Sequence, residues 1–182
     1  MVDQLVSKGV NVLFCIGGDG TLKGANAIAE EVKKRRLLIS VIGIPKTIDN
    51  DLSFVEKTFG FETSVQIASD IITSAHTEAI CAENGIGIVK LMGRDSGFIS
   101  ASATLANSVV DFCLVPETYF QLEGKGGLFR ALEKRLKEHQ YSVIVVAEGA
   151  GQHLFLNAPE RKDISGNLIK EDIGLFLKQQ LE

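Results

Sequence analysis

The chain has 182 residues, of which 45% are hydrophobic and 23% charged, with a net charge of −4, so it can bury a substantial core as an ordinary soluble protein. Lys and Arg are scattered apart from the run 33–36, which excludes a basic surface for nucleic acid. No apolar stretch approaches the ~20 residues that span a bilayer, and the three cysteines lack zinc-site spacing, so we expect a cytoplasmic protein that does not enter a membrane.

Apolar runs rich in Val and Ile alternate with amphipathic segments along the chain. The pattern predicts strands at 12–16, 38–44, 86–92, 112–115 and 143–147, and helices at 22–35, 62–79, 98–106, 128–139 and 170–181. The strands are almost continuously apolar, which is typical of a parallel sheet covered on both faces. We therefore expect an α/β fold in three αβα layers, with an irregular segment at 148–167.

A polar cluster follows each predicted strand. The clusters are "GGDGT", "PKTIDND", "GRDSG", "PE" and "EGAG", in chain order. In open α/β sheets the ligand crevice lies at the carboxyl ends of the strands. Five separate clusters are therefore predicted to converge on one site.

The first cluster, "GGDGTLKGA" at 17–25, is a glycine-rich turn between a strand and a helix. Such a turn lets backbone amides approach a phosphate. Asp19 would repel a bare phosphate, which suggests a divalent cation between the two. A tight turn capped by Asp19 is the alternative interpretation.

The second cluster places Asp49 and Asp51 on either side of Asn50. Two neighbouring carboxylates ionise together only when a cation offsets their repulsion. One could then act as a general base on a hydroxyl while the other holds the metal. Lys46 and Thr47 could donate to a phosphate, although a polar type I turn would explain the same residues.

The third and fifth clusters add Arg94 and Glu148. An arginine at a phosphate site can stabilise the charge that develops in phosphoryl transfer. A carboxylate at the end of the strand "SVIVVAEG" suits the hydroxyls of a sugar. Asp95 and Ser96 are interpreted as helix-capping residues.

In this order "GGDGT", "PKTIDNDL", "FGFETSV", "LMGRDSGF", "VPE" and "AEGAGQ" resemble the 6-phosphofructokinase family. The resemblance implies a two-domain fold with Rossmann-like sheets, in which 1–60 is part of a nucleotide-binding lobe and 61–182 part of a sugar-phosphate lobe. It also implies magnesium-dependent phosphoryl transfer to the 1-hydroxyl of fructose 6-phosphate by an allosteric homo-oligomer. "GGDGT" alone occurs in NAD and diacylglycerol kinases, which lack "PKTIDND" in this arrangement.

The resemblance also implies roles for individual residues. Asp49 resembles the general base, with Thr47 beside the transferring phosphoryl group, and Arg94 the residue that stabilises that group. Asp19 and Asp51 resemble the carboxylates on the magnesium side. The remaining matches are nucleotide-phosphate contacts (Gly18, Gly20, Thr21, Lys46) and sugar-phosphate contacts (Met92, Gly93, Glu148).

Gly20 and Lys46 both bear on the identity of the phosphoryl donor, and they favour different donors. Glycine after "GGD" resembles ATP users, whereas lysine before "TIDND" occurs in diphosphate users. Plant and trypanosomatid-like ATP enzymes combine both, so ATP is the expected donor. Family members are longer, and we expect this chain to be a fragment that is inactive or weakly active on its own; a diphosphate-dependent enzyme and an inactive sugar-phosphate-binding regulatory subunit are the alternatives.

Overall fold

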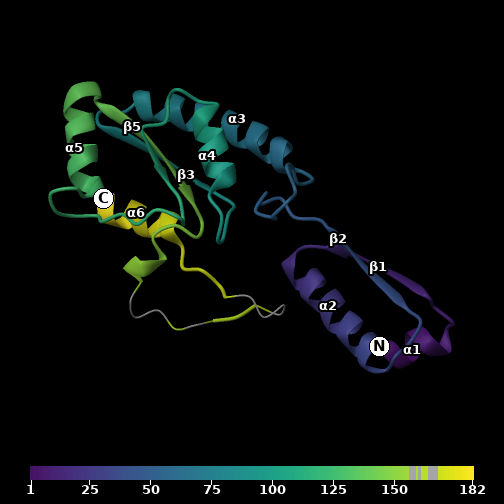
Figure 1. Ribbon diagram of the computed structural model, residues 1–182. Coiled ribbons are helices and arrows are strands. Elements are labelled where there is room, and N and C mark those ends of the chain that lie inside the picture. Colours follow the sequence, from purple (N-terminus) through teal and green to yellow (C-terminus); the bar gives the residue numbers. More distant parts are fainter. Residues whose placement is uncertain (156–158, 160, 164–167) are drawn as a thin grey trace. The chain divides into compact units, whose positions relative to one another are not determined.

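A computed structural model describes residues 1–155, 159, 161–163 and 168–182 of the chain. The fold is α/β, as predicted, with parallel pairing throughout the sheets of the described residues. The chain forms two compact units, and Figure 1 labels their helices and strands. The first comprises Met1–Ile48 with Lys162 and Asp163, and the second comprises Asp49–Arg161 with Leu168–Glu182.

The first unit is a β-α-β arrangement. Helix α1 (Val2–Ser7) precedes strand β1 (Val12–Gly17), helix α2 (Asp19–Lys34) and strand β2 (Ser40–Pro45). β1 and β2 pair in parallel, with the Cα of Gly17 opposite that of Pro45. Helix α2 packs against both strands and covers one face of this sheet.

The other face of this two-stranded sheet is exposed within its unit. Phe14 is 58% exposed and Ile16 is 64% exposed, while Leu13 and Cys15, which alternate with them, are half-buried. The prediction that these strands are buried on both faces is wrong for this unit, because α2 supplies only one covering layer.

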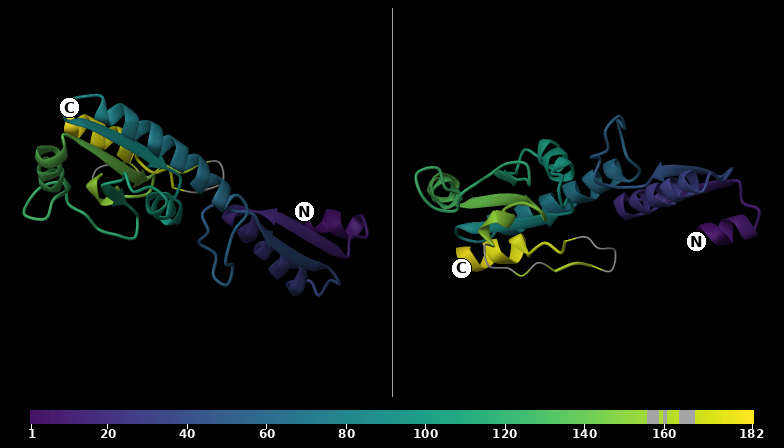
Figure 2. Two further views of the ribbon diagram at one scale, coloured as in Figure 1. Left: turned by 90° about the horizontal axis from the view of Figure 1, so that it is seen from above. Right: turned by 60° about the horizontal axis from the view of Figure 1, so that its bottom comes forward.

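The second unit is a three-layer αβα sandwich. Its elements are α3 (Phe61–Ile80), β3 (Gly85–Leu91), α4 (Phe98–Leu105), β4 (Phe112–Leu114), α5 (Leu128–His139), β5 (Tyr141–Ala147), the short 3₁₀ helix η1 (Gln152–Leu154) and α6 (Ile173–Leu181). The parallel sheet has the order β3-β5-β4, so β5 is central. Helix α3 runs along this sheet (Figure 2) and packs with α4 on one face, while α5 and α6 pack on the other.

The alternation of β5 divides the core between the two faces. Val143 and Val145 pack against Ile72 of α3, in a cluster that also contains Ala103 of α4. Ile144 and Val146 pack in the cluster of α5 and α6. All four strand residues are fully buried, so the central strand matches the prediction of a sheet covered on both faces.

Several element boundaries differ from those predicted. Helix α2 begins at Asp19 rather than residue 22, so part of the predicted glycine turn is helical. Leu38 lies outside β2 and is almost fully exposed. Helix α6 begins at Ile173 because Asp172 caps it. The irregular segment predicted at 148–167 contains η1, but residues 156–158, 160 and 164–167 lie outside the described part.

No helix in the part of the chain that the structure describes is long and apolar enough to cross a membrane. The described cysteines Cys15, Cys81 and Cys113 are free thiols.

Candidate active site

The predicted site residues are divided between the two units. Gly18, Asp19, Gly20, Thr21, Lys46 and Thr47 belong to the first unit, and Asp49, Asp51, Met92, Gly93, Arg94 and Glu148 belong to the second. Residues 49–60 lie in the same unit as α3. The assignment of the two predicted lobes to nucleotide and to sugar stays a prediction, as does convergence of the first cluster with the others.

In the first unit, the ends of β1 and β2 are joined by a backbone hydrogen bond. The Lys46 N–H donates to the Gly17 carbonyl over 2.7 Å. A Cβ at Gly17 would lie 2.6 Å from the Cβ of Thr21, so glycine is what lets the first turn of α2 approach the strand end. The end of β1, Thr21 in the first turn of α2 and the backbone N–H of Lys46 are therefore held close together.

Gly18 caps α2 through its backbone alone, and Asp19 occupies the first turn. The Asp19 carboxylate forms an ion pair with Lys23, one turn later, at 2.5 Å. Both side chains are exposed. Asp19 is therefore not the helix cap of the alternative interpretation, and its carboxylate faces solvent in this unit.

In the second unit, the turns that follow β3 and β5 are packed backbone against backbone. The Glu148 N–H donates to the Leu91 carbonyl at 2.9 Å, and the Gly149 N–H donates to the Gly93 carbonyl at 3.0 Å. A Cβ at Gly149 would lie 2.5 Å from the Arg94 carbonyl carbon. Glycine at 149 therefore permits the approach that brings Arg94 and Glu148 to the same edge of the sheet.

Asp49 lies half-buried among charged side chains of this unit. Burial raises the pKa of Asp49, and repulsion by Asp51 and Glu148 raises it further, while the Arg94 guanidinium acts in the opposite direction. Asp51 is exposed. The segment after β2 thus brings Asp49 within electrostatic reach of Asp51, Glu148 and Arg94, while the roles predicted for these four residues stay predictions.

Two anchors of this edge were not identified as such from the sequence. The Ser96 hydroxyl donates to the main-chain carbonyl of Asp49 at 3.1 Å, and the Glu117 carboxylate accepts from the Gly97 N–H at 2.8 Å. Neither Asp95 nor Ser96 is the N-cap of α4, so the predicted capping roles are wrong. Gly97 is the N-cap, and Asp95 pairs with Lys170. "VPE" marked Glu117 as conspicuous, but its partner is a backbone amide without a sequence signal.

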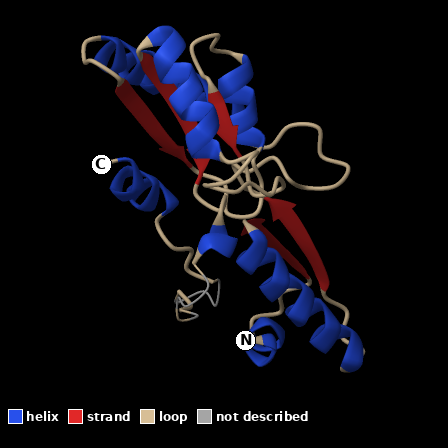
Figure 3. Ribbon diagram, turned by 90° about the vertical axis from the view of Figure 1, so that its left-hand side faces the viewer, coloured by secondary structure: helices blue, strands red, loops and turns tan. Residues whose placement is uncertain are grey.

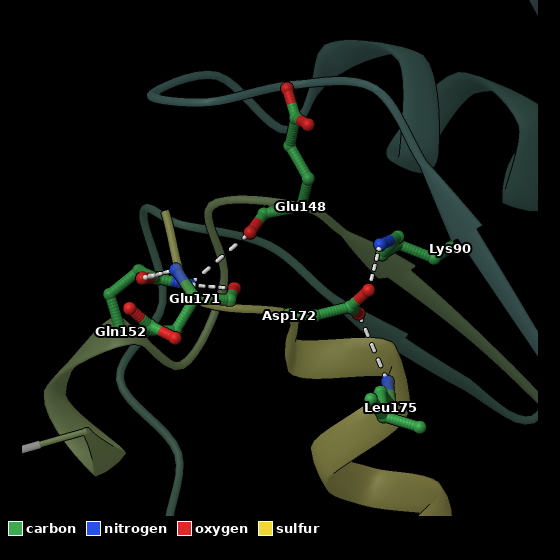
Figure 4. Close-up of polar contacts among 6 residues, drawn as sticks. All are labelled: Lys90, Glu148, Gln152, Glu171, Asp172 and Leu175. Atoms are coloured by element: carbon green, nitrogen blue, oxygen red, sulfur yellow. Dashed lines mark hydrogen bonds and ion pairs between the residues drawn. The ribbon is translucent and has the colours of Figure 1, made fainter. Parts of the chain in front are cut away.

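A third anchor, Gln152, lies in η1 after β5. Its amide nitrogen donates to the carbonyls of Glu148 at 3.3 Å and Glu171 at 3.1 Å, and its oxygen accepts from the Glu171 N–H at 3.0 Å (Figure 4). The Glu148 side chain points away from Gln152 in this view. Gln152 therefore fixes the backbone of Glu148 while leaving its carboxylate available to a ligand.

Figure 3 shows the loops that follow β3, β4 and β5 gathered at the arrowhead end of their sheet. Within the described residues no group of three or more His, Cys, Asp or Glu side chains is arranged to hold a metal ion. The predicted metal carboxylates, Asp19 and Asp51, lie in different units. This edge is thus a carboxylate and arginine site built from one unit, with chemistry suited to a phosphorylated, hydroxyl-bearing ligand.

Comparison with known proteins identifies the relatives of the chain. A model of the family described as Phosphofructokinase matches residues 1–181. ATP-dependent 6-phosphofructokinase 7 of Arabidopsis thaliana is 53% identical over 100% of this chain and 38% of its own length. The ATP-dependent 6-phosphofructokinase of Borreliella burgdorferi is 52% identical over 100% of this chain and 42% of its own. The chain thus spans about two fifths of the length of these relatives.

Solved structures agree with the fold. The pyrophosphate-dependent phosphofructokinase of Marinobacter aquaeolei superposes with a TM-score of 0.66 and 25% identity, over 82% of this chain and 39% of that one. The phosphofructokinase of Saccharomyces cerevisiae gives a TM-score of 0.59 at 24% identity, over 82% and 22%. With a family match over nearly its whole length and a parallel-sheet fold in common with solved members, the chain belongs to the phosphofructokinase family.

Proposed function

We propose that the chain carries the phosphoryl-transfer centre of an ATP-dependent 6-phosphofructokinase. The reaction converts ATP and D-fructose 6-phosphate to ADP and D-fructose 1,6-bisphosphate with magnesium. One observation carries the proposal: Asp49, Arg94 and Glu148 interact at the carboxyl edge of a single sheet. A base, a guanidinium and a second carboxylate at that edge suit phosphoryl transfer to a sugar hydroxyl.

In this proposal Asp49 takes the proton from the 1-hydroxyl of the sugar as the hydroxyl oxygen attacks the terminal phosphorus of ATP. Its half-buried setting beside Asp51 and Glu148 makes it more basic than an isolated aspartate, which suits that role. Arg94 stabilises the charge on the transferring group, with Thr47 beside it. Glu148, Met92 and Gly93 contact the sugar phosphate.

Asp19 and Asp51, each in its own unit, are the carboxylates proposed for the magnesium side, because both are exposed and carboxylate oxygens are the hard ligands that this ion prefers. When bound, the ion neutralises charge on the phosphates. Gly18, Gly20 and Thr21 supply the backbone and hydroxyl donors of the nucleotide-phosphate loop, and Lys46 adds a cation at the neighbouring strand end.

ATP is the proposed donor because Gly20 follows "GGD" and because the relatives compared above carry ATP-dependent names. Diphosphate is the second candidate, favoured by Lys46 and by the name of the Marinobacter structure. A coupled assay with fructose 6-phosphate and magnesium, run with each donor on the longer enzyme of which this chain is expected to be a part, separates them. Turnover with ATP and not with diphosphate is expected, and the opposite preference would overturn the choice of donor.

Substitution of Asp49 by Asn tests the chemistry directly. We expect kcat to fall by about 10² to 10⁴ while the KM for fructose 6-phosphate stays near normal, because a general base acts mainly in the transition state. Asp95→Asn is the matched control, since Asp95 is an exposed carboxylate near the same site that pairs with Lys170. Equal kcat in wild type and Asp49→Asn refutes the base.

The alternative of an inactive regulatory subunit makes a different prediction for the same protein. Calorimetry would then show fructose 6-phosphate binding with no turnover by either donor. Retention of Asp19, Asp49 and Arg94 together favours the enzyme, because a protein that only binds sugar phosphate needs neither a base nor a metal carboxylate.

The proposal extends to a cytoplasmic, homo-oligomeric and allosteric enzyme, as the family resemblance implies. Free thiols at all three described cysteines fit a reducing compartment. Sedimentation analysis measures the oligomeric state, and a monomer at all concentrations would contradict that part of the proposal.

A further inference from the structure

Ser96 lies between the Arg94 turn and helix α4 and is only 3% exposed. Its hydroxyl oxygen is 3.1 Å from the Asp49 main-chain carbonyl, to which it donates, and 3.5 Å from the Phe98 amide nitrogen. The bond joins positions 47 residues apart. A buried serine thus connects the turn after β3 to the segment that carries the proposed base.

The turn that carries Ser96 is itself firmly held. The next residue, Gly97, donates its N–H to the Glu117 carboxylate at 2.8 Å, and Gly93 accepts from Gly149 on the neighbouring turn. Helix α4 begins directly after it. The Ser96 hydroxyl therefore projects from a backbone held by Glu117, by Gly149 and by the start of α4, so this hydrogen-bond donor is fixed in position.

The segment on the other side of the bond is an irregular loop. Asn50 accepts from the Thr58 N–H at 2.8 Å, and Asn50 and Phe54 both have left-handed backbone angles, with φ of 57° and 66°. Phe54 is fully exposed and Asp51 is exposed. Such a loop, without regular secondary structure, depends on individual bonds to place its residues.

We propose that Ser96 is a positioning residue for Asp49. Its hydroxyl holds the Asp49 backbone so that the carboxylate stays beside Arg94 and Glu148. The inference rests on the proposed function only for the role of Asp49; the tether itself is independent of the reaction.

The tether is tested by amide hydrogen exchange on the full 182-residue chain with Ser96→Ala. Exchange in residues 50–58 should accelerate about five- to tenfold, as expected from loss of one hydrogen bond. The matched control is Ser100→Ala, because Ser100 is also buried in the same region and its hydroxyl has no hydrogen-bond partner within the described residues. Equal exchange in residues 50–58 for the two variants overturns the proposal.

Kinetics of the longer enzyme of which this chain is expected to be a part provide the readout that a merely structural serine would not change. Ser96→Ala should lower kcat about tenfold with little change in the KM for fructose 6-phosphate, and Ser96→Cys, which keeps a weak donor of similar shape, should fall between. In an Asp49→Asn background the Ser96→Ala change should cost nothing further, since the residue acts through Asp49.

The two hypotheses fail in different ways. If Asp49→Asn keeps full kcat, the proposed base is wrong, and the exchange experiment still decides whether Ser96 tethers the loop. If Asp49→Asn loses turnover while Ser96→Ala matches Ser100→Ala in both kcat and exchange, the function stands and the role of Ser96 is refuted.

Discussion

Gly149 provides the most direct structural test of the second unit, because a single methyl group there meets backbone rather than a flexible side chain. A Cβ at this position would lie 2.5 Å from the Arg94 carbonyl carbon and 3.1 Å from its Cα, and closer still to the carbonyl oxygen. Ordinary carbon contacts begin at about 3.5 Å. Gly149→Ala therefore forces the two strand-end turns apart and strains the hydrogen bond from Gly149 to Gly93.

Overpacking of a well-packed site costs about 1 to 3 kcal/mol. We expect the upper end, about 3 kcal/mol, because both clashing groups are main chain. For a chain of this size each kcal/mol lowers Tm by about 2 to 4 °C, so the midpoint should fall by about 6 to 12 °C. Separation of Arg94 from Glu148 should also lower kcat.

Tyrosine fluorescence during urea unfolding is a suitable assay. The chain has two tyrosines and no tryptophan, and Tyr119 and Tyr141 both lie in the second unit, so the signal reports that unit alone. Gly126→Ala is the matched control, since a Cβ there meets nothing within 4 Å. If Gly149→Ala unfolds within about 0.5 kcal/mol of Gly126→Ala, the inferred backbone clash is wrong.

The contacts in Figure 4 make further predictions for the same urea assay. Asp172 pairs with Lys90 at 2.7 Å and caps α6 through the Leu175 N–H at 3.0 Å, so Asp172→Asn should cost less than about 1 kcal/mol and Asp172→Ala about 1 kcal/mol more. The Lys90 hydrogen bond, followed by the Leu175 amide, lowers the pKa of Asp172 below its usual 3.8. The stability that this carboxylate contributes is therefore present above pH 3.8 and lost as pH falls through the lower folded pKa; a wild-type advantage over Asp172→Ala that is unchanged at acid pH contradicts the assignment. Gln152→Ala removes three hydrogen bonds to the Glu148 and Glu171 backbone and should cost about 2 kcal/mol, whereas the same change at an exposed glutamine of α6, Gln179, should cost almost nothing.

The second unit could be predicted well from sequence because its elements carry local signals. The run "SVIVVA" is apolar at every position except Ser142, and it forms the fully covered central strand. Asp49, Arg94 and Glu148 were expected at one edge because each follows a predicted strand. Asp172 before an apolar helix was a capping signal that the prediction of a helix from residue 170 did not use.

The differences arise where structure depends on partners distant in the chain. Whether Phe14 is covered depends on how many layers pack on β1, which its own apolar neighbours do not encode. The bond from Ser96 ends on a main-chain carbonyl, and every residue has such a group. The ion pair of Asp19 with Lys23 could have been predicted from the sequence, because oppositely charged residues at i,i+4 commonly pair on a helix.

The residues at the proposed centre are positioned in two physically different ways. Glu148 comes directly after a strand whose four central Val and Ile residues are fully buried, so its backbone inherits the rigidity of the core. Asp49 has no such strand before it within its unit, and a hydrogen bond from the Ser96 hydroxyl ties its backbone to the turn after β3. Substitution of Gly149 should therefore disturb Arg94 and Glu148 together and destabilise the unit. Substitution of Ser96 should instead release Asp49 with little effect on global stability. The position of Asp49 on its loop can thus change without a change at the rigid sheet edge that carries Arg94 and Glu148.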